Sequence, residues 1–480
     1  MSRQITLIAL FLSIGFGALQ AQETWSLEKC IQYARQNNLT VKQSQYQISA
    51  ADLDLSQARA DRYPNVSAGV SGGLNFGRTI DPVTNDFIDS RIGFNSVSLD
   101  VGLLVYNGGR INNTIKQSKL NLEAAKLDAE TSANDIGLLV ASTYLNILLF
   151  EEQLENARFN LAQTTQQLEQ TDKLIEAGSL PVNDRFDFVA QQALNEQNII
   201  EAQNQITINY LTLKQLLELD PGTELKIQRP VVTIPSDADP AAFSVEEVFT
   251  TSLGIQPQIA AGEKRLQSAF LDEKIAQSGL LPSVRIFGSL SSNYSDQALD
   301  FTAQPDVQFG DVTESVLING QPATITQQDV VLSASFPGRG YIDQLQDNFG
   351  QSVGIRIDIP IYSNSRNLIN MERARVGALI QEVQNRQLRN TLKADVQRAI
   401  ADAKASSEAM KAAERTVEAS QVAFDNAQRR FEVGSINSLE FNTAQNTLQR
   451  AQVDLIRSKY QYLFNLKIVD FYMGRPIKLD

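Results

Sequence analysis

Apolar residues recur every seven positions along two long stretches of this chain. The large residues of this series are Leu154, Leu161, Leu168 and Ile175 in the first stretch, and Met410, Val417, Phe424 and Phe431 in the second. Smaller residues follow three positions after each, namely Ala157, Thr164, Thr171 and Gly178, then Ala413, Ser420, Ala427 and Gly434. A large residue at one seam position and a small one at the next predict two helices packed as a left-handed coiled coil.

The two stretches are copies of one unit. Tyr106–Gly178 recurs 256 positions later as Tyr362–Gly434, and the register holds throughout. Neither copy contains proline. Each can therefore form one helix of about 71 residues, which is about 107 Å long. Ordinary globular domains rarely contain so long a helix, so the repeat indicates a duplicated, elongated architecture.

Each copy is preceded by segments that alternate with a period of two, which is typical of β-strands. In the first half, Asn95, Val97, Leu99, Val101, Leu103 and Val105 alternate with Ser96, Ser98, Asp100 and Gly102. In the second half, Val353, Ile355, Ile357, Ile359 and Ile361 alternate with Ser352, Gly354, Arg356 and Asp358. Partner strands start after Pro64 and Pro282. The order strand, strand, helix, helix therefore occurs twice.

A strand with one apolar and one charged face separates water from a protein core or a lipid bilayer. The adjoining helices show no broad apolar face that could cover four such strands, which favours the bilayer. Because lipid does not tolerate an open sheet edge, other copies must complete a barrel. Two copies give a barrel that side chains fill, whereas three give twelve strands and a lumen. We expect Arg356 and Asp358 to line that lumen.

The other segments flank or connect these elements. Along the chain we expect a signal peptide at 1–21, N-terminal helices at 22–62, a first barrel hairpin at 63–106, a first helix pair at 107–219 with its tip near 178–181, a linker at 220–254, a further helix at 255–280, a second barrel hairpin at 281–362, a second helix pair at 363–472 with its tip near 434–437, and a tail at 473–480. The second hairpin holds a long polar loop at 298–348, which could contain its own small hairpin near 316–326.

Composition excludes several classes of function. The net charge of −13 disfavours nucleic acid as a partner. The chain has no histidine and one cysteine, Cys30, which excludes imidazole relays, the usual zinc sites and an intrachain disulfide. We expect no metal and no cofactor. The apolar stretch Ile136–Phe150 includes Ser142, Thr143 and Asn146, and we expect a locally buried helix face there rather than a membrane span.

In the order of its segments, the chain resembles the TolC family of outer-membrane efflux channels. The resemblance covers essentially the whole mature chain and rests on the doubled unit, the strand starts at Tyr63 and Leu281, the segment Val105–Arg110 and the tip sequence Val433–Ser435. It implies a mainly α fold with a membrane β-barrel, in which a homotrimer forms twelve strands continued by a long periplasmic α-helical barrel. It also implies a passive, non-enzymatic duct in the outer membrane of a Gram-negative bacterium, with a tip that docks a periplasmic adaptor and an inner-membrane transporter.

The two tips carry a candidate pore constriction. Asp184 and Glu440 occupy equivalent positions after the two tip glycines, and Asp187 follows on the same helix as Asp184. Three copies of such acids around a narrow pore attract cations. The resemblance assigns Glu440 to the constriction, whereas the family's second acid is Thr443 here. Acids in the first turn also stabilise a helix through its dipole, which is the competing explanation.

The resemblance implies that Asp184 also ties the closed tip together. The basic partner position of the family is Ile436 here, and the neighbouring aromatic residue is Phe431, which has no hydroxyl group. We therefore expect that network to be absent and expect Asp187 with Arg185 as a substitute.

Two further sets of residues have candidate roles. We expect the adaptor to dock on small and apolar residues presented at the exposed turns, namely Gly178, Ser179, Leu180, Gly434, Ser435 and Ile436. A plain helix hairpin that needs glycine explains the same pattern. Tyr106 and Tyr362 lie where strand meets helix, which favours anchoring at the membrane interface over ordinary packing.

Two other functions compete with the duct. The first is a periplasmic coiled-coil structural or adaptor protein without a pore, which requires the four alternating segments to be soluble in water. The second is an outer-membrane enzyme that uses Asp184 with Asp187. No pattern in the chain builds a concave substrate site around these carboxylates, so the duct remains the favoured hypothesis.

Overall fold

The structure is a computed structural model that describes residues 24–80, 87–230 and 243–479. The expected signal peptide at 1–21 and the linker residues Pro235 and Pro240 lie outside the described residues. The chain forms two compact units. Of the described residues, the helical unit contains 24–54, 118–230, 243–269 and 376–479, and the sheet unit contains 55–80, 87–117 and 270–375.

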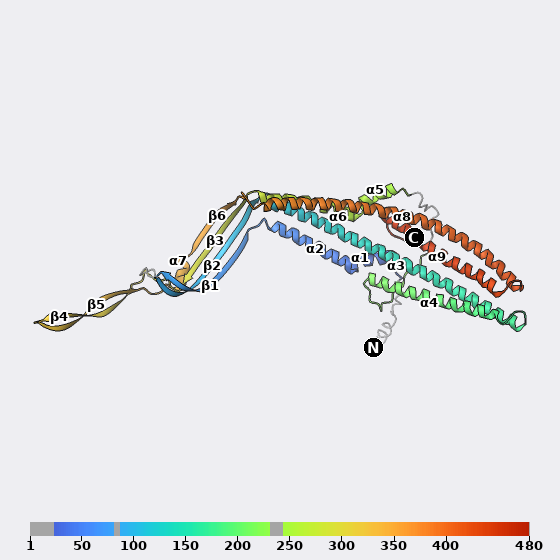
Figure 1. The fold of residues 1–480 in the computed structure, drawn as a ribbon, viewed down its shortest axis with the longest axis horizontal. Helices are drawn as coiled ribbons and strands as arrows, with labels where there is room; N and C mark the ends of the chain where they lie inside the picture. The colour runs from blue at the N-terminus through green and yellow to red at the C-terminus, as the bar shows by residue number, and fades with distance from the viewer. Residues whose placement is uncertain (1–23, 81–86, 231–242, 480) are drawn as a thin grey trace, which may run out of the picture. The chain divides into compact units, whose positions relative to one another are not determined.

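The long helices reproduce the duplication. The helices are α1 (Leu27–Asn37), α2 (Leu39–Ala60), α3 (Arg110–Glu176), α4 (Asp184–Leu216), α5 (Val245–Ile255), α6 (Pro257–Gln277), α8 (Arg366–Glu432) and α9 (Ser438–Tyr472). Both α3 and α8 contain 67 residues, and their bounds are 256 positions apart (Figure 1). The prediction of two equivalent uninterrupted helices is confirmed, with each slightly shorter than expected.

The same turn precedes both long helices and explains the shorter length. The backbone has positive φ angles of 64° at Gly108, 82° at Gly109, 50° at Asn364 and 60° at Ser365. Asn107 and Ser363 occupy equivalent positions, and the side chain of each accepts a backbone hydrogen bond of 3.3 Å from the first turn of its helix. Left-handed residues cannot continue a right-handed helix, so each helix begins only after the turn.

Both helices end in the same way at their tips. Gly178 and Gly434 each have a φ angle of 73°. The next residue donates its N–H back across the last turn, from Ser179 to the Leu174 carbonyl and from Ser435 to the Arg430 carbonyl, each at 2.8 Å. This is a Schellman motif, in which glycine satisfies the left-handed position without the strain that a Cβ atom introduces.

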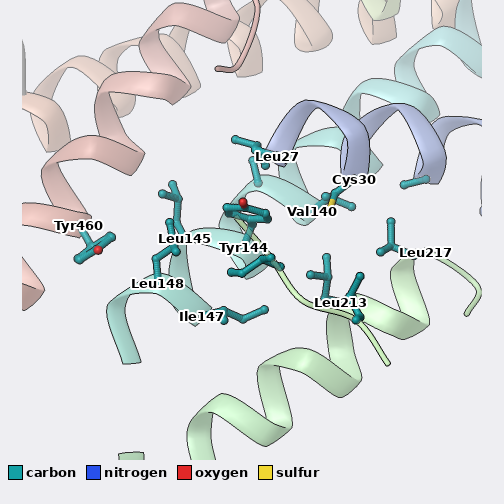
Figure 2. Packing of buried hydrophobic residues seen from close by; sticks show 14 of the residues in the cluster. Leu27, Cys30, Val140, Tyr144, Leu145, Ile147, Leu148, Leu213, Leu217 and Tyr460 are labelled. Carbon is teal, nitrogen blue, oxygen red and sulfur yellow. The ribbon is translucent and has the colours of Figure 1, made fainter. Parts of the chain in front are cut away.

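The main core of the helical unit surrounds Tyr144 of α3. Figure 2 shows this ring near Leu27 and Cys30 of α1, and Leu213 of α4 belongs to the same cluster. The Tyr144 hydroxyl lies 2.6 Å from the carbonyl oxygen of Gln228. Among the described residues, α3 is the one helix long and apolar enough to cross a membrane. One face of its apolar stretch, with Val140, Tyr144 and Leu148, is buried in this cluster, whereas Leu139 on another face is exposed, which confirms the predicted buried helix face.

The sheet unit contains a four-stranded antiparallel sheet. Its strands are β1 (Asn65–Ile80), β2 (Phe87–Asn107), β3 (Ser283–Ser295) and β6 (Gly350–Asp358), hydrogen-bonded in that order (Figure 1). The first two extend further than the alternating pattern suggested. The last is shorter than expected, because Pro360 has no N–H to donate and ends the pairing before Tyr362.

The loop at 298–348 has structure of its own. It contains a separate hairpin of β4 (Asp306–Ile318) and β5 (Gln321–Ser335), followed by α7 (Tyr341–Asp347). The hairpin turn is Asn319 and Gly320, with φ angles of 53° and 81°, as a two-residue type I′ turn requires. The small hairpin expected near 316–326 is therefore present and is longer than the sequence suggested.

Candidate functional site

One face of the four-stranded sheet is largely apolar, and its polar residues Arg91, Asn95, Ser292 and Gln351 lie toward one end of the strands. The register places on this face Val66, Ala68, Val70, Leu74 and Phe76 of β1, Val97, Leu99, Val101 and Leu103 of β2, Val284, Ile286 and Leu290 of β3, and Val353, Ile355 and Ile357 of β6. Many of them are exposed in the single chain, with Val353 84% accessible. A face this apolar is incompatible with water unless lipid or protein covers it.

The opposite face of the same sheet is polar. It carries Asn65, Ser67, Gly69 and Ser71 of β1, Ser96, Ser98, Asp100 and Gly102 of β2, Ser283, Arg285, Phe287, Ser289 and Ser291 of β3, and Ser352, Gly354, Arg356 and Asp358 of β6. Arg356 and Asp358 therefore lie together on this face. The sequence reasoning missed Arg285, although its position between Val284 and Ile286 gives the same alternating signal.

The two tyrosines expected at the membrane interface have different surroundings. The β2–β3 register shifts between Leu104 and Tyr106, so that Tyr106 pairs with Val284 on the apolar face. This bulge reverses the alternation, since the sequence pattern alone places Tyr106 on the polar face. Tyr362 lies outside β6 and is 80% exposed. The expectation that Tyr362 ends a strand is wrong, because β6 ends at Asp358, before Pro360, which has no N–H to donate.

The helical unit also carries apolar stripes without a partner in the single chain. On α2, Leu39, Tyr46 and Leu53 are spaced by seven and are all exposed. On α8, Val376, Leu379, Ile380 and Val383 are among the exposed apolar residues. A seven-residue spacing of apolar residues on a helix is the pattern of a seam between helices, and no described helix of the same chain covers these residues.

An aromatic cluster holds the tip of the helical unit together. Phe441 of α9 is 1% exposed, and its ring centroid lies 5.9 Å from that of Phe188 of α4 and 5.1 Å from that of Phe431 of α8. Ile436 is buried against the same rings. The expectation that Ile436 is presented at an exposed turn is therefore wrong, because the chain folds this side chain back into the aromatic cluster.

The acids of the tip have specific partners. The Ser438 hydroxyl lies 2.6 Å from Asp187 Oδ2 and 3.1 Å from Asp184 Oδ1. Arg185 forms its ion pair of 2.9 Å with Asp172 of α3. In the described residues Arg185 thus pairs with Asp172 of the facing helix and not with Asp187 as expected, and Asp187 accepts from Ser438 instead. At the tip, the hydroxyl group of Ser438 joins α9 to the two carboxylates of α4.

The remaining tip residues are accessible. Glu440 is exposed, and its backbone N–H donates to Asn437 Oδ1 over 2.9 Å as part of an N-cap. Gly178, Ser179, Gly434 and Ser435 are exposed, and Leu180 is half-buried. Sequence reasoning missed further exposed apolar residues around the same turns, which are Val182, Phe186, Val433 and Leu439. Their position beside the tip glycines was the available signal.

Metal chemistry has no support in the described part of the chain. No group of three or more histidine, cysteine or acidic side chains with a geometry suited to a metal ion occurs among the described residues. Cys30 is fully buried, and burial raises the pKa of its thiol to about 12. Burial likewise raises the pKa of Tyr210 to about 12, with the Glu151 carboxylate as a further cause. These groups belong to the core rather than to a reactive site.

Comparison with known proteins gives one consistent family. A family described as outer membrane efflux protein matches residues 30–218 and 250–475. The pyoverdine export outer membrane protein OpmQ of Pseudomonas putida is 27% identical over 303 residues, which are 58% of this chain and 61% of OpmQ. The outer membrane protein TolC of Vibrio cholerae is 22% identical over 470 residues, which cover 96% of this chain and 93% of TolC.

The fold agrees with that family. The crystal structure of CusC superposes with a TM-score of 0.73 at 18% identity, over 96% of each chain. This chain therefore has the mainly helical fold with a β-sheet that outer-membrane channels of this kind share. The match to OpmQ spans only about three fifths of that relative's length.

Proposed function

Because this chain belongs to the outer membrane efflux protein family, we propose that three copies form an outer-membrane channel that is the passive exit duct of a tripartite system. The protein is an outer-membrane protein of a Gram-negative bacterium, and members of its family are transport channels. In this proposal the cargo arrives from an inner-membrane transporter through a periplasmic adaptor. The duct itself performs no catalysis and needs no cofactor.

The observation that carries the proposal is the two-faced sheet with free edges. Within the described part of one chain, its order leaves β1 and β6 without an outer neighbour. Lipid contacts on the apolar face require every backbone group to be paired, so the sheet must close with sheets from other copies. Three copies give twelve strands, enough to enclose water, and the polar face with Arg356 and Asp358 then lines the lumen.

The helical stripes support the same assembly. The stripe on α2 and the stripe on α8 are both exposed in one copy and are different surfaces. In this assembly the one stripe of a copy therefore contacts the other stripe of the next copy. Such head-to-tail contacts close into a ring when the rotation fits. We assign the α2 stripe of each copy to the α8 stripe of its neighbour. The outcome is a tubular wall of helices.

The tip is assigned two roles. Glu440 is free to face the pore axis, and three copies of it form an acidic constriction, with Asp184 and Asp187 held nearby by Ser438. Leu180, with the exposed apolar residues around both turns, is assigned to the adaptor. Tyr106 anchors the sheet at the membrane interface.

Detergent-purified protein tests the assembly. We expect a trimer by light scattering, heat-sensitive migration on denaturing gels and ion conductance in planar bilayers. Val353→Asp puts a carboxylate on the apolar face, at a cost per copy below the roughly 2 to 4 kcal/mol of an arginine or lysine at the bilayer midplane, and three copies together should prevent assembly. Ser352→Asp is the matched control on the polar face and should assemble. A water-soluble monomer, stable without detergent, contradicts the channel and supports the periplasmic structural protein.

A further inference from the structure

Two arginines face each other across the polar side of the sheet. Arg285 of β3 and Arg356 of β6 are direct register partners. Both side chains are exposed to solvent. Among the described residues, neither guanidinium group has an ion pair with a carboxylate. Like charges directly opposite one another destabilise a sheet.

The position of Arg356 is defined by an aromatic ring. Its guanidinium carbon lies 6.0 Å from the centroid of Phe287. That ring lies over Gly354, where an added Cβ atom would come within 2.6 Å of Phe287 Cζ. Glycine therefore leaves space for the ring, and the ring supports the guanidinium group through a cation–π contact. The ring is thus one contact of a side chain that is otherwise exposed to solvent.

A hollow lies beside the arginine pair. Its volume is about 330 Å³, and its polar lining comes from Asn65, Ser67, Asp100, Arg285 and Arg356. Asp100 is the acid of this lining, and it already accepts a hydrogen bond of 3.1 Å from the Ser98 hydroxyl. The lining of this hollow holds two guanidinium groups and one carboxylate, and Asp358 lies outside it at the next position of β6 on the same face. The guanidinium groups present donors in a fork that matches the oxygens of a carboxylate or phosphate.

We propose that Arg285 and Arg356 form an anion-binding site for carboxylate- or phosphate-bearing solutes in the lumen of the barrel. The inference rests on the proposed trimeric channel, which brings three such sites around one pore. The barrel then favours anions, whereas the acidic tip favours cations. The positive ring raises the local concentration of anionic cargo in the barrel.

Reversal potentials in planar bilayers test the site. In a KCl gradient at low ionic strength, where screening is weak, the double variant Arg285→Gln with Arg356→Gln should raise the K⁺ to Cl⁻ permeability ratio roughly threefold over wild type. Arg91→Gln is the control, since this arginine of the same sheet lies on the other face, in register with Phe76, and is already paired with Asp296 at 3.7 Å. It should leave the ratio unchanged. Equal ratios in wild type and the double variant overturn the site.

Inorganic pyrophosphate gives a second measurement that does not depend on the glutamine variant folding. Millimolar pyrophosphate should reduce the wild-type current, and Arg285→Lys with Arg356→Lys should weaken this block while keeping the permeability ratio, because lysine retains the charge and loses the fork. Conductance without pyrophosphate block in wild type overturns the site and leaves the channel intact. Failure of the wild-type protein to form trimers or to conduct refutes the proposed function itself, and the site with it.

Discussion

Ser438 joins the two halves of the duplicated chain at the tip. Its hydroxyl oxygen lies 2.6 Å from Asp187 Oδ2 and 3.1 Å from Asp184 Oδ1. The residue is the first of α9, is 2% exposed, and contacts the first turn of α4. Since a hydroxyl group carries one hydrogen, it donates to one carboxylate at a time and the two acids share it.

Removing that hydroxyl should loosen the tip. Ser438→Ala leaves two neighbouring carboxylates without their common donor, at a cost of about 1 to 3 kcal/mol. We expect faster amide hydrogen exchange at the start of α4 and α9 and a larger single-channel conductance. Ser435→Ala is the control, because that side chain is exposed at the turn. Unchanged exchange and conductance in Ser438→Ala would show that the contact does not hold the tip.

The aromatic cluster should contribute more than the hydroxyl contact. Phe441→Ala removes a ring that packs against Phe188, Phe424 and Phe431. Deleting such a buried ring costs about 3 to 5 kcal/mol. We expect the tip to exchange amide hydrogens early in a denaturant series, while the core around Tyr144 stays protected. Phe159→Ala, at an exposed position of α3, should change neither region. Loss of protection throughout the helical unit would contradict a local role.

At the turns before the long helices, replacing glycine with alanine should lower the stability of the protein, whereas replacing a left-handed serine with glycine should raise it. Gly108→Ala adds a Cβ atom 2.9 Å from Leu281 Cβ at a φ angle of 64°, so we expect it to destabilise the protein by at least about 1 to 2 kcal/mol. Ser365→Gly relieves a φ angle of 60° at the equivalent turn and should raise the melting temperature slightly. Gly102→Ala, with no atom near its Cβ position, is the control. Thermal unfolding in detergent measures all three, and a stable Gly108→Ala variant would contradict the strain.

Much of this fold follows from periodicity, and the exceptions have local causes. The offset of 256 positions places both long helices and both tip glycines, because a duplicated sequence repeats its backbone requirements. Alternation assigns Arg356 to the polar face. The bulge at Leu104 that turns Tyr106 to the apolar face leaves no mark in the apolar pattern, since β-bulges depend on the pairing of two strands.

The tip shows the same limit for tertiary contacts. Ile436 lies at a turn, where sequence reasoning expects exposure, yet the helices of both halves converge there and bury it. The pairing of Arg185 with Asp172 depends on how α3 and α4 face each other, which heptad spacing alone leaves open. By contrast, the end of β6 was foreseeable from Pro360, because a proline cannot donate to the neighbouring strand.

Cys30 should be inert in the folded protein. Its thiol has a pKa of about 12 against an ordinary value of 9.0, because burial disfavours the thiolate. Between pH 9 and 12 the unfolded chain releases this proton, whereas the folded chain keeps it. The thiol's contribution to the free energy of unfolding is therefore fully present below pH 9. It falls by up to about 1.4 kcal/mol per pH unit as the pH rises through this range.

Maleimide labelling and thermal unfolding measure this effect. Native protein at pH 8 should react only after denaturation, since the side chain is fully buried. The difference in melting temperature between wild type and Cys30→Ala should shrink as the pH rises from 9 to 11. Comparing the two proteins removes the contribution of Tyr210, whose pKa is also raised. Rapid labelling of the native protein would contradict the burial.

Charged substitutions separate docking from folding at the tip. Leu180 is half-buried and Val182 is exposed, so Leu180→Asp and Val182→Asp should leave trimers intact and abolish both export and cross-linking to the adaptor. Ile436→Asp buries a charge in the aromatic cluster and should instead destabilise the tip by several kcal/mol, lowering the yield of trimer. Trimer content on unheated gels and cross-linking yield in whole cells distinguish the two effects. Full export by Leu180→Asp and Val182→Asp would remove this surface from the docking site, because an apolar contact cannot retain its affinity with a carboxylate placed at its centre.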